Sequence, residues 1–191
     1  MNDEKLLTEF PQLETVRLKL RKLSAADAND IFEYACIQEA AHFLIWEPHT
    51  SINDSSEFIS FADQQFNDSN SIIWGIELKE EKKLIGTIDL RGYSSLHRCG
   101  DVGYVISQKY WRRGIVSEAF RALIDFGFGV LNLNRIESHC EHENTGSWKV
   151  MEKAGLVYEG TLREKILIKG KFRTMKMYSI LKSDWLNNDK N

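Results

Sequence analysis

The hydrophobic and polar residues of this chain alternate with two different periods. In residues 15–23, Val16, Leu18 and Leu20 alternate with basic side chains, a period of two that predicts a half-buried strand. Runs of the same kind, bounded by turn-forming or charged residues, predict six further strands. These strands are expected at residues 71–78, 83–91, 101–107, 135–141, 157–168 and 172–181.

Other stretches repeat their apolar residues at helical spacing. Between residues 115 and 131, Val116, Phe120 and Leu123 fall on one face, which predicts an amphipathic helix. Ser24 with Asp27 is typical of a helix start, and Gly155 is typical of a helix end. The three other helices are expected at residues 24–41, 51–67 and 144–155.

The elements follow one another in the order β–α–α–β–β–β–α–β–α–β–β. This order predicts an α+β (mixed α/β) domain in which about four helices flank one central, mainly antiparallel sheet of seven strands. The strand–helix–strand unit at residues 101–141 is expected to be parallel or splayed. The 191 residues fit one domain, 1–191, with a core at about 15–186 and a frayed tail after Trp185.

Composition and charge exclude several classes of function. Hydrophobic residues make up 42% of the chain and charged residues 28%, which is ordinary for a globular protein. A net charge of -3 gives no basic footprint, so nucleic acid is not an expected partner. The N-terminus lacks the basic start and apolar run of a signal peptide, and no apolar run approaches the length of a membrane span. We therefore expect a cytoplasmic protein with no membrane partner.

Neither the cysteines nor the histidines indicate a metal centre. The three cysteines lie far apart and form no C-x-x-C pair. The cluster His139, Cys140, Glu141 and His142 lies on a predicted strand, where alternate side chains point to opposite faces. These four residues therefore cannot converge on one ion, and no metal is expected.

The stretch from Tyr110 to Phe128 begins with a basic turn and continues into a predicted helix, directly after the predicted strand that ends at Ser107. The turn contains Arg112, Arg113 and Gly114. The first turn of a helix offers unpaired N–H groups and the positive end of the helix dipole, and both favour a bound phosphate. Taken alone, the two arginines could equally belong to a solvated basic turn.

Three motifs in the right order resemble the GNAT N-acyltransferase superfamily. They are GYVIS (103–107), the frame Trp111-Arg112-Arg113-Gly114-Ile115-Val116, and ENTGSWKVMEKAGLVYEG (143–160). The likeness is greatest to the branch that includes ribosomal-protein alanine N-acetyltransferases of the RimJ/RimL type. Val116 departs from the family pattern, which has a small residue at that position.

The resemblance implies acetyl-CoA as the acyl donor. The pantetheine arm would then pair with the strand edge at Tyr104, Val105 and Ile106, in a gap where the fourth and fifth strands splay apart. The pyrophosphate would bind the N–H groups of the turn and the helix start, namely Arg112, Arg113, Gly114, Ile115, Val116 and Ser117.

Asn144 and Ser147 match the second cofactor motif of the family. The Asn144 side chain has donors and an acceptor that suit pantetheine amides. Ser147, three residues later, would protonate the departing CoA thiolate. Alternatively, Asn144 only caps the helix and Ser147 is a surface polar residue.

The acceptor side is less determined by the sequence. A carboxylate is a common base for deprotonating an amine, and the candidates are Asp101 and Glu164, although both could be ordinary exposed strand carboxylates. Trp46, His49 and Trp74 are expected to line the acceptor side, with Trp74 alternatively in the core.

These features together predict an N-acetyltransferase. The acetyl group would pass directly from acetyl-CoA to a primary amine, either a protein N-terminal α-amine or a small-molecule amine. The alternative is a non-catalytic acyl-CoA sensor or interaction subunit with the same fold. Self-association as a homodimer is a further expectation.

Overall fold

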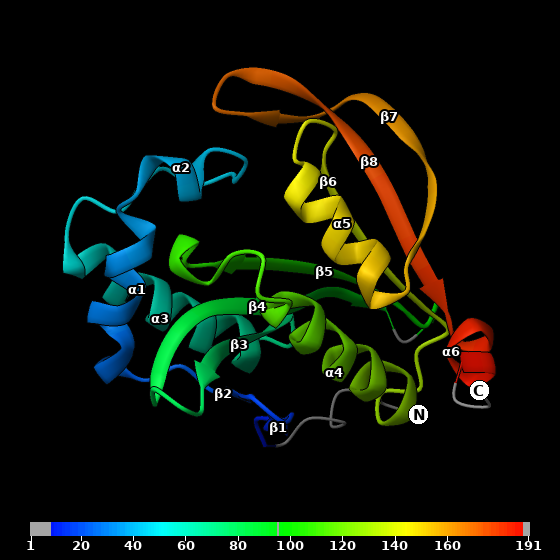
Figure 1. Ribbon diagram of the computed structural model, residues 1–191, viewed down its shortest axis with the longest axis horizontal. Coiled ribbons are helices and arrows are strands. Elements are labelled where there is room, and N and C mark those ends of the chain that lie inside the picture. The colour runs from blue at the N-terminus through cyan, green and yellow to red at the C-terminus, as the bar shows by residue number, and fades with distance from the viewer. Residues whose placement is uncertain (1–8, 95, 189–191) are drawn as a thin grey trace.

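The computed structural model of the protein describes residues 9–94 and 96–188. It is built on one eight-stranded sheet in the order β1-β2-β3-β4-β5-β6-β8-β7 (Figure 1). The strands are β1 (Leu13–Glu14), β2 (Leu18–Arg21), β3 (Ser71–Leu78), β4 (Lys83–Ser94), β5 (Cys99–Ile106), β6 (Arg135–Glu141), β7 (Val157–Ile168) and β8 (Lys171–Leu181). The helices are α1 (Ala28–Ala35), α2 (Gln38–Ala41), α3 (Ile52–Asn67), α4 (Ile115–Gly129), α5 (Thr145–Ala154) and α6 (Lys182–Asn188), with short 3-10 turns η2 (Ala25–Asp27) and η3 (Gln108–Tyr110).

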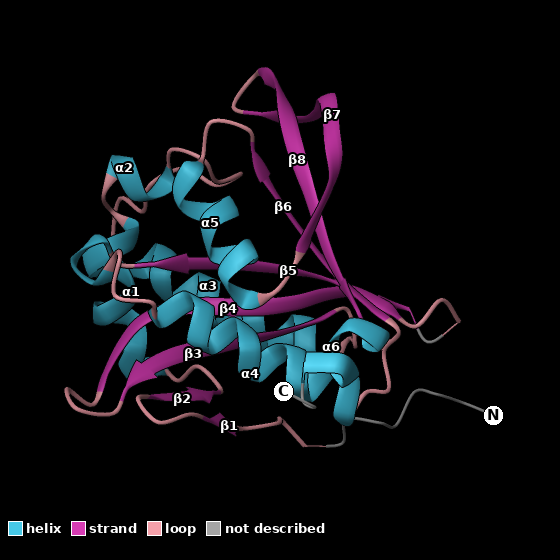
Figure 2. Cartoon of the chain, turned by 45° about the vertical axis from the view of Figure 1, so that its right-hand side comes forward, coloured by secondary structure: helices cyan, strands magenta, loops and turns pink. Residues whose placement is uncertain are grey.

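The sheet separates into two parts at the junction of β5 and β6. All other neighbouring strands are antiparallel, whereas β5 and β6 are parallel and pair only from Cys99↔Arg135 to Asp101↔Glu137. Beyond Asp101 the two strands diverge, and Figure 2 shows β6, β8 and β7 rising away from β3, β4 and β5. The mixed sheet and its splay, both expected from the sequence, are therefore confirmed.

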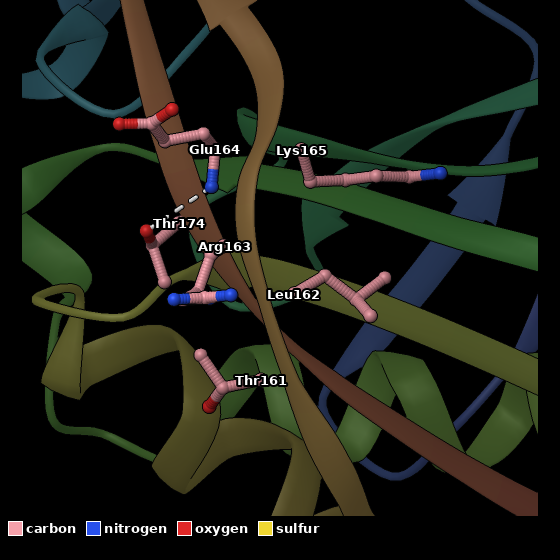
Figure 3. A pocket seen from close by; sticks show the side chains of 6 residues that line it. All are labelled: Thr161, Leu162, Arg163, Glu164, Lys165 and Thr174. Carbon is pink, nitrogen blue, oxygen red and sulfur yellow. Dashed lines mark hydrogen bonds between the residues drawn. The ribbon is translucent and has the colours of Figure 1, made fainter.

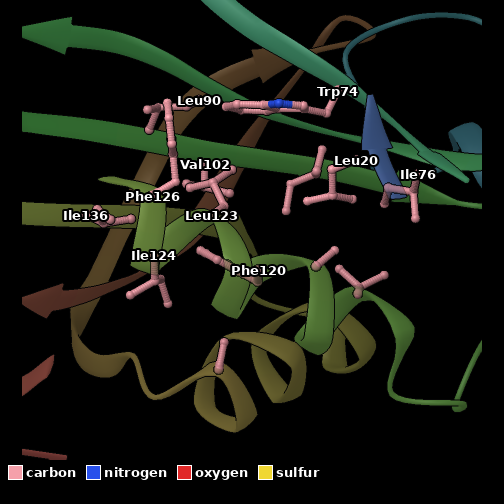
Figure 4. Close-up of a cluster of buried hydrophobic side chains, with 14 of the residues drawn as sticks. Leu20, Trp74, Ile76, Leu90, Val102, Phe120, Leu123, Ile124, Phe126 and Ile136 are labelled. Atoms are coloured by element: carbon pink, nitrogen blue, oxygen red, sulfur yellow. The ribbon is translucent and has the colours of Figure 1, made fainter. Parts of the chain in front are cut away.

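Helix α4 packs its apolar face against the first part of the sheet. Phe120 and Leu123 are fully buried and lie in one cluster with Trp74 and Val102 (Figure 4). A second cluster, with Ile31 from α1 and Ile59 from α3, covers the opposite face of the same sheet. Burial of apolar area on both faces fixes β5 between two layers of helices.

Several predicted boundaries needed correction. The helix expected at 24–41 is broken into η2, α1 and α2, because Ile37 adopts extended backbone angles (φ -88, ψ 122). The first strand is shorter than expected, and β1 raises the number of strands from seven to eight. Val16 is 94% exposed, since a tight turn with a Thr15 N–H to Leu18 carbonyl bond (2.9 Å) interrupts the alternation.

The end of the chain also differs from the expectation. Instead of a frayed tail, the described part ends in α6. The Trp185 indole N–H donates to Asp125 Oδ1 (2.7 Å), and its ring lies 5.7 Å from that of Phe128. These contacts hold the C-terminal helix against α4. Residues 189–191 of the expected tail lie outside the described residues.

Phe120 is the test of this packing. Phe120→Ala should lower the free energy of unfolding by about 3–5 kcal/mol, because it leaves a cavity between α4 and the sheet. Phe61 on α3 is half exposed. Phe61→Ala should therefore change stability by no more than about 0.5 kcal/mol in the same denaturant titration. Equal effects of the two substitutions would contradict the assigned core.

Candidate active site

The gap between β5 and β6 exposes one edge of β5. The bond from the Ser107 N–H to the Ile85 carbonyl (2.8 Å) sets the alternation of the β4–β5 ladder. Backbone groups of Val102, Tyr104 and Ile106 therefore point away from β4, whereas those of Val105 point toward it. Tyr104 thus presents its N–H and carbonyl to the gap.

Side chains donate hydrogen bonds to the backbone carbonyls on either side of Tyr104. The Val102 carbonyl accepts a hydrogen bond from Ser138 Oγ (2.7 Å), and the Ile106 carbonyl accepts one from the Trp111 indole (3.0 Å). The open part of the edge is therefore short and centred on Tyr104. An extended ligand with amide groups could bond there as an added strand does.

The N-terminus of α4 lies just beyond this edge. Gly114, the N-cap residue, has a left-handed backbone (φ 71), and so does Arg112 (φ 62). Because Gly114 has no side chain, no capping group covers the N–H groups of the first turn. Val116 is only 6% exposed and packs in the core, so its branched side chain does not crowd a ligand at the helix end.

Two basic side chains from distant parts of the chain lie near this helix end, and one of them, Arg17, is ion-paired with Glu118 of α4 (2.6 Å). A Cβ atom placed on Gly114 would lie 3.4 Å from Lys153 Nζ and 3.9 Å from an Arg17 nitrogen. Arg17 also donates to the Arg113 carbonyl (3.0 Å). Sequence reasoning missed Lys153 and Arg17, because only the packing of α5 and of the β1–β2 turn against α4 brings them here.

Tyr104 and Ser147 join the gap to α5. The Tyr104 hydroxyl lies 2.8 Å from Ser147 Oγ, and its ring lies 5.8 Å from that of Phe120. Burial raises the pKa of Tyr104, so the phenol stays protonated at neutral pH. Two hydroxyl groups that can donate protons therefore lie beside the open strand edge.

Asn144 caps the N-terminus of α5, as the alternative interpretation of this residue expected. Its Oδ1 accepts a hydrogen bond from the Ser147 N–H (3.1 Å), which begins α5. The amide Nδ2 has no partner among the described residues and is available to a ligand. Burial raises the pKa of the nearby Cys140 thiol to about 11, so this cysteine is a poor nucleophile.

Asp101 lies on the opposite face of β5 from Tyr104. Its Oδ2 is 3.1 Å from His139 Nδ1, and its Oδ1 is 3.6 Å from an Arg91 nitrogen. Arg91 in turn lies 3.8 Å from Asp89. Burial raises the pKa of Asp89 to about 6. A Cβ on Gly103 would lie 2.7 Å from Asp89 Oδ1, so a glycine here gives these side chains room.

The aromatic residues expected on the acceptor side divide into two groups. Trp46 and His49 lie together in the loop after α2, with ring centroids 5.5 Å apart. His49 Nδ1 is 2.8 Å from Ser55 Oγ, and burial lowers the pKa of His49. Trp74 is fully buried, and its indole donates to the Pro11 carbonyl (2.6 Å). The assignment of Trp74 to the acceptor side is therefore wrong, and its core alternative is correct.

Glu164 lies on the outer hairpin rather than beside the gap. It has a left-handed backbone (φ 50) in a stretch of β7 where the register with β8 shifts. Its N–H donates to Thr174 Oγ1 (3.3 Å), beside an open hollow of about 790 Å³ (Figure 3). Strands β6 and β8 separate β7 from β5 in the sheet. The structure shows no contact of Glu164 with Asp101 or Ser147, and its catalytic role stays a prediction. The hollow is lined by Thr161, Leu162, Arg163, Glu164, Lys165 and Thr174.

Comparison with known proteins shows the family to which the chain belongs. The family model for the acetyltransferase (GNAT) domain matches residues 17–157. The chain belongs to the GNAT acetyltransferase family.

Relatives match along nearly the whole chain. An N-acetyltransferase of Bacillus subtilis named YoaA is 34% identical over 173 residues, which cover 91% of this chain and 98% of that protein. A GNAT-family acetyltransferase of Bacillus anthracis has a TM-score of 0.81 at 27% identity, over 91% of this chain and 99% of that chain. A spermidine N-acetyltransferase of Vibrio cholerae in complex with CoA and spermine has a TM-score of 0.76 at 26% identity, over 91% and 100%.

This GNAT protein is an N-acetyltransferase, and its donor is acetyl-CoA. The described residues fit that donor, with cations and free N–H groups for its phosphates and an open strand edge for its arm. Among the described residues, no group of three His, Cys, Asp or Glu side chains could hold a metal ion. No helix in the described part of the chain is long and apolar enough to cross a membrane.

Lys153 gives a test of the phosphate site. Lys153→Ala should raise the KM for acetyl-CoA about three- to tenfold with little change in kcat, because a solvent-exposed charge contact contributes about 1 kcal/mol. The effect should weaken at high salt. Lys171→Ala, on the exposed hairpin turn, serves as the control and should leave the KM unchanged. An unchanged KM in Lys153→Ala would remove Lys153 from the site.

Proposed function

We propose that this N-acetyltransferase transfers acetyl directly to a primary amine, without an acyl-enzyme. One observation carries the proposal: groups suited to protonate the leaving thiolate and to deprotonate the amine flank the same gap from opposite faces. Tyr104 and Ser147 lie on the face covered by α4 and α5. Asp101 lies on the other face, together with His139.

The direction of the donor follows from the course of the chain. Strand β5 runs from its junction with β6 toward the loop before α4. A donor whose phosphates bind the N-terminus of α4 therefore extends back along β5, and its thioester end lies near the junction. We therefore expect the reacting carbonyl beside Tyr104 rather than at the open mouth of the gap.

Ser147 is positioned to supply the proton of the leaving thiolate. Its hydroxyl lies at the start of α5, where Asn144 fixes the backbone and the Tyr104 hydroxyl is 2.8 Å away. A hydroxyl pair can pass a proton to the thiolate and be refilled from solvent. Cys140, the buried cysteine near this pair, is held as a neutral thiol, which agrees with direct transfer.

The acceptor would approach from the face that carries α1 and α3. The loop with Trp46 and His49 lies on this side. It is joined to the outer hairpin by Lys169, which donates to the Ala41 carbonyl (2.9 Å) and lies 3.5 Å from Glu47. Carboxylates on this face favour an amine that arrives as a cation. Among the relatives, one is named for spermidine and another for a ribosomal protein, so both small amines and protein N-termini are candidate acceptors.

Ser147→Ala should lower kcat about 10- to 100-fold while changing the KM for acetyl-CoA less, because the hydroxyl acts on the leaving group. Tyr104→Phe should lower kcat by a smaller factor, since Ser147 remains. Release of free thiol measures both. Ser60→Ala on α3 is a neutral control. A larger change in KM than in kcat for Ser147→Ala would make Ser147 a binding residue only.

A panel of acceptors tests the proposed function itself. We expect acetyl-CoA-dependent thiol release with spermidine, a simple primary monoamine, or a peptide beginning with alanine or serine. The same peptide with a blocked N-terminus and no lysine should be inert. If acetyl-CoA raises the melting temperature but no amine is acetylated, the protein binds the donor without this turnover and the proposal is wrong.

A further inference from the structure

His139 lies where the two halves of the sheet begin to separate. It is two residues beyond Glu137, the last β6 residue that pairs with β5. Its Nδ1 is 3.1 Å from Asp101 Oδ2, within hydrogen-bonding distance. Its Nε2 forms no hydrogen bond with any of the described residues, and the side chain is 20% exposed. One ring nitrogen therefore faces a carboxylate and the other is free.

The alternation of β6 places His139 across the gap from the hydroxyl pair. Ile136 and Cys140 belong to the core under α4 and α5, so His139 points to the opposite face, as Asp101 does on β5. Tyr104 and Ser147 lie on the α4 and α5 side. A thioester in the gap beside Tyr104 would thus have Ser147 on one face and His139 on the other.

Charged side chains surround His139 on this face of the sheet. Asp101 is close, and its other oxygen is buried without a hydrogen-bond partner in the described structure, with only Arg91 at 3.6 Å. Glu141 on β6 is neutralised by Arg173 of β8 (2.9 Å). The charged side chains on the same face of the sheet as His139 include Asp89 and Arg91 on β4, Asp101 on β5, Arg135, Glu137 and Glu141 on β6, and Arg173 on β8.

We propose that His139, oriented by Asp101, is the general base that accepts the proton of the acceptor amine. This inference rests on the proposed function. The acceptor first loses its ammonium proton to solvent, and the neutral amine nitrogen then forms a bond to the acetyl carbonyl carbon as the carbon–sulfur bond of the thioester breaks. The amine proton passes to His139 Nε2, while the thiolate takes a proton from Ser147 Oγ. Asp101 accepts a hydrogen bond from the Nδ1–H group of His139 and stabilises the imidazolium that forms.

Asp101 then has a different role from the one expected from the sequence. The sequence suggested this carboxylate as the base itself, but His139 covers the Oδ2 atom that would act. Asp101 is then a positioning residue that fixes which ring nitrogen carries hydrogen. The 3.1 Å distance between His139 Nδ1 and Asp101 Oδ2 is short enough for this positioning role, because such hydrogen bonds often shorten when substrates bind.

His139→Asn tests the assignment, because asparagine can still contact Asp101 but has no second ring nitrogen. With spermidine or an alanine peptide, whichever the wild type acetylates, its kcat should fall about 100-fold or more. His142→Asn is the matched control, since His142 lies immediately after β6, at a position whose alternation is opposite to that of His139. It should retain wild-type rates.

Imidazole rescue separates chemistry from structure. Free imidazole should raise the kcat of His139→Ala at least about tenfold and should not affect the control. Asp101→Asn should lower kcat about tenfold, because the imidazole would lose the group that orients it. In every variant, acetyl-CoA should still raise the melting temperature, which shows that the fold and donor site are intact.

Three outcomes would overturn the base assignment while the proposed function stands. The first is a His139→Asn kcat within threefold of wild type. The second is a greater loss in Asp101→Asn than in His139→Asn, which would make Asp101 the base. The third is a loss in His139→Ala that imidazole does not restore. Failure of the wild type to acetylate any amine would instead contradict the proposed function.

Discussion

The short parallel contact between β5 and β6 is the constraint on which the rest of the structure depends. In the backbone ladder between the two strands, only Cys99, Gly100 and Asp101 of β5 are paired with β6. Each strand has a longer ladder on its other side, β5 with β4 and β6 with β8. The two half-sheets can therefore diverge without losing their own pairing. An unpaired backbone group away from water costs about 1–3 kcal/mol, which a ligand with amide groups would recover.

The splay also separates the chemical groups of the site. Side chains at alternate positions of β5 reach opposite faces of the sheet, so Tyr104 joins Ser147 while Asp101 joins His139. In a continuous sheet the two pairs could not act on one substrate. In the proposed mechanism, the gap would let both pairs reach the same carbonyl and would keep the proton donor for the thiolate away from the proposed base.

The core and the site share residues, so stability and function are coupled. Phe120 fills the space between α4 and the sheet, and its ring also supports Tyr104. Helix α4 thereby has two expected roles, since its buried face fixes β5 and its N-terminus with Gly114 is the candidate anion site. Movement of this helix would displace the phosphates and the hydroxyl pair together.

The sequence by itself determined the features that depend on near neighbours. Local backbone geometry decides these features, so they could be predicted. They are the periods of the strands and helices, the turn at Gly114 and the capping of α5, in which Asn144 accepts from the Ser147 N–H. Only the tertiary structure brought Lys153 to Gly114 and buried Trp74, since both depend on how distant elements pack.

The meeting of His139 with Asp101 depended on tertiary structure in the same way. The pairing of Asp101 with Glu137 places both side chains on one face, and a shift of one residue would turn His139 to the other face. The sequence therefore determined which residues are available to the site, whereas register and packing between distant segments decided which of them meet.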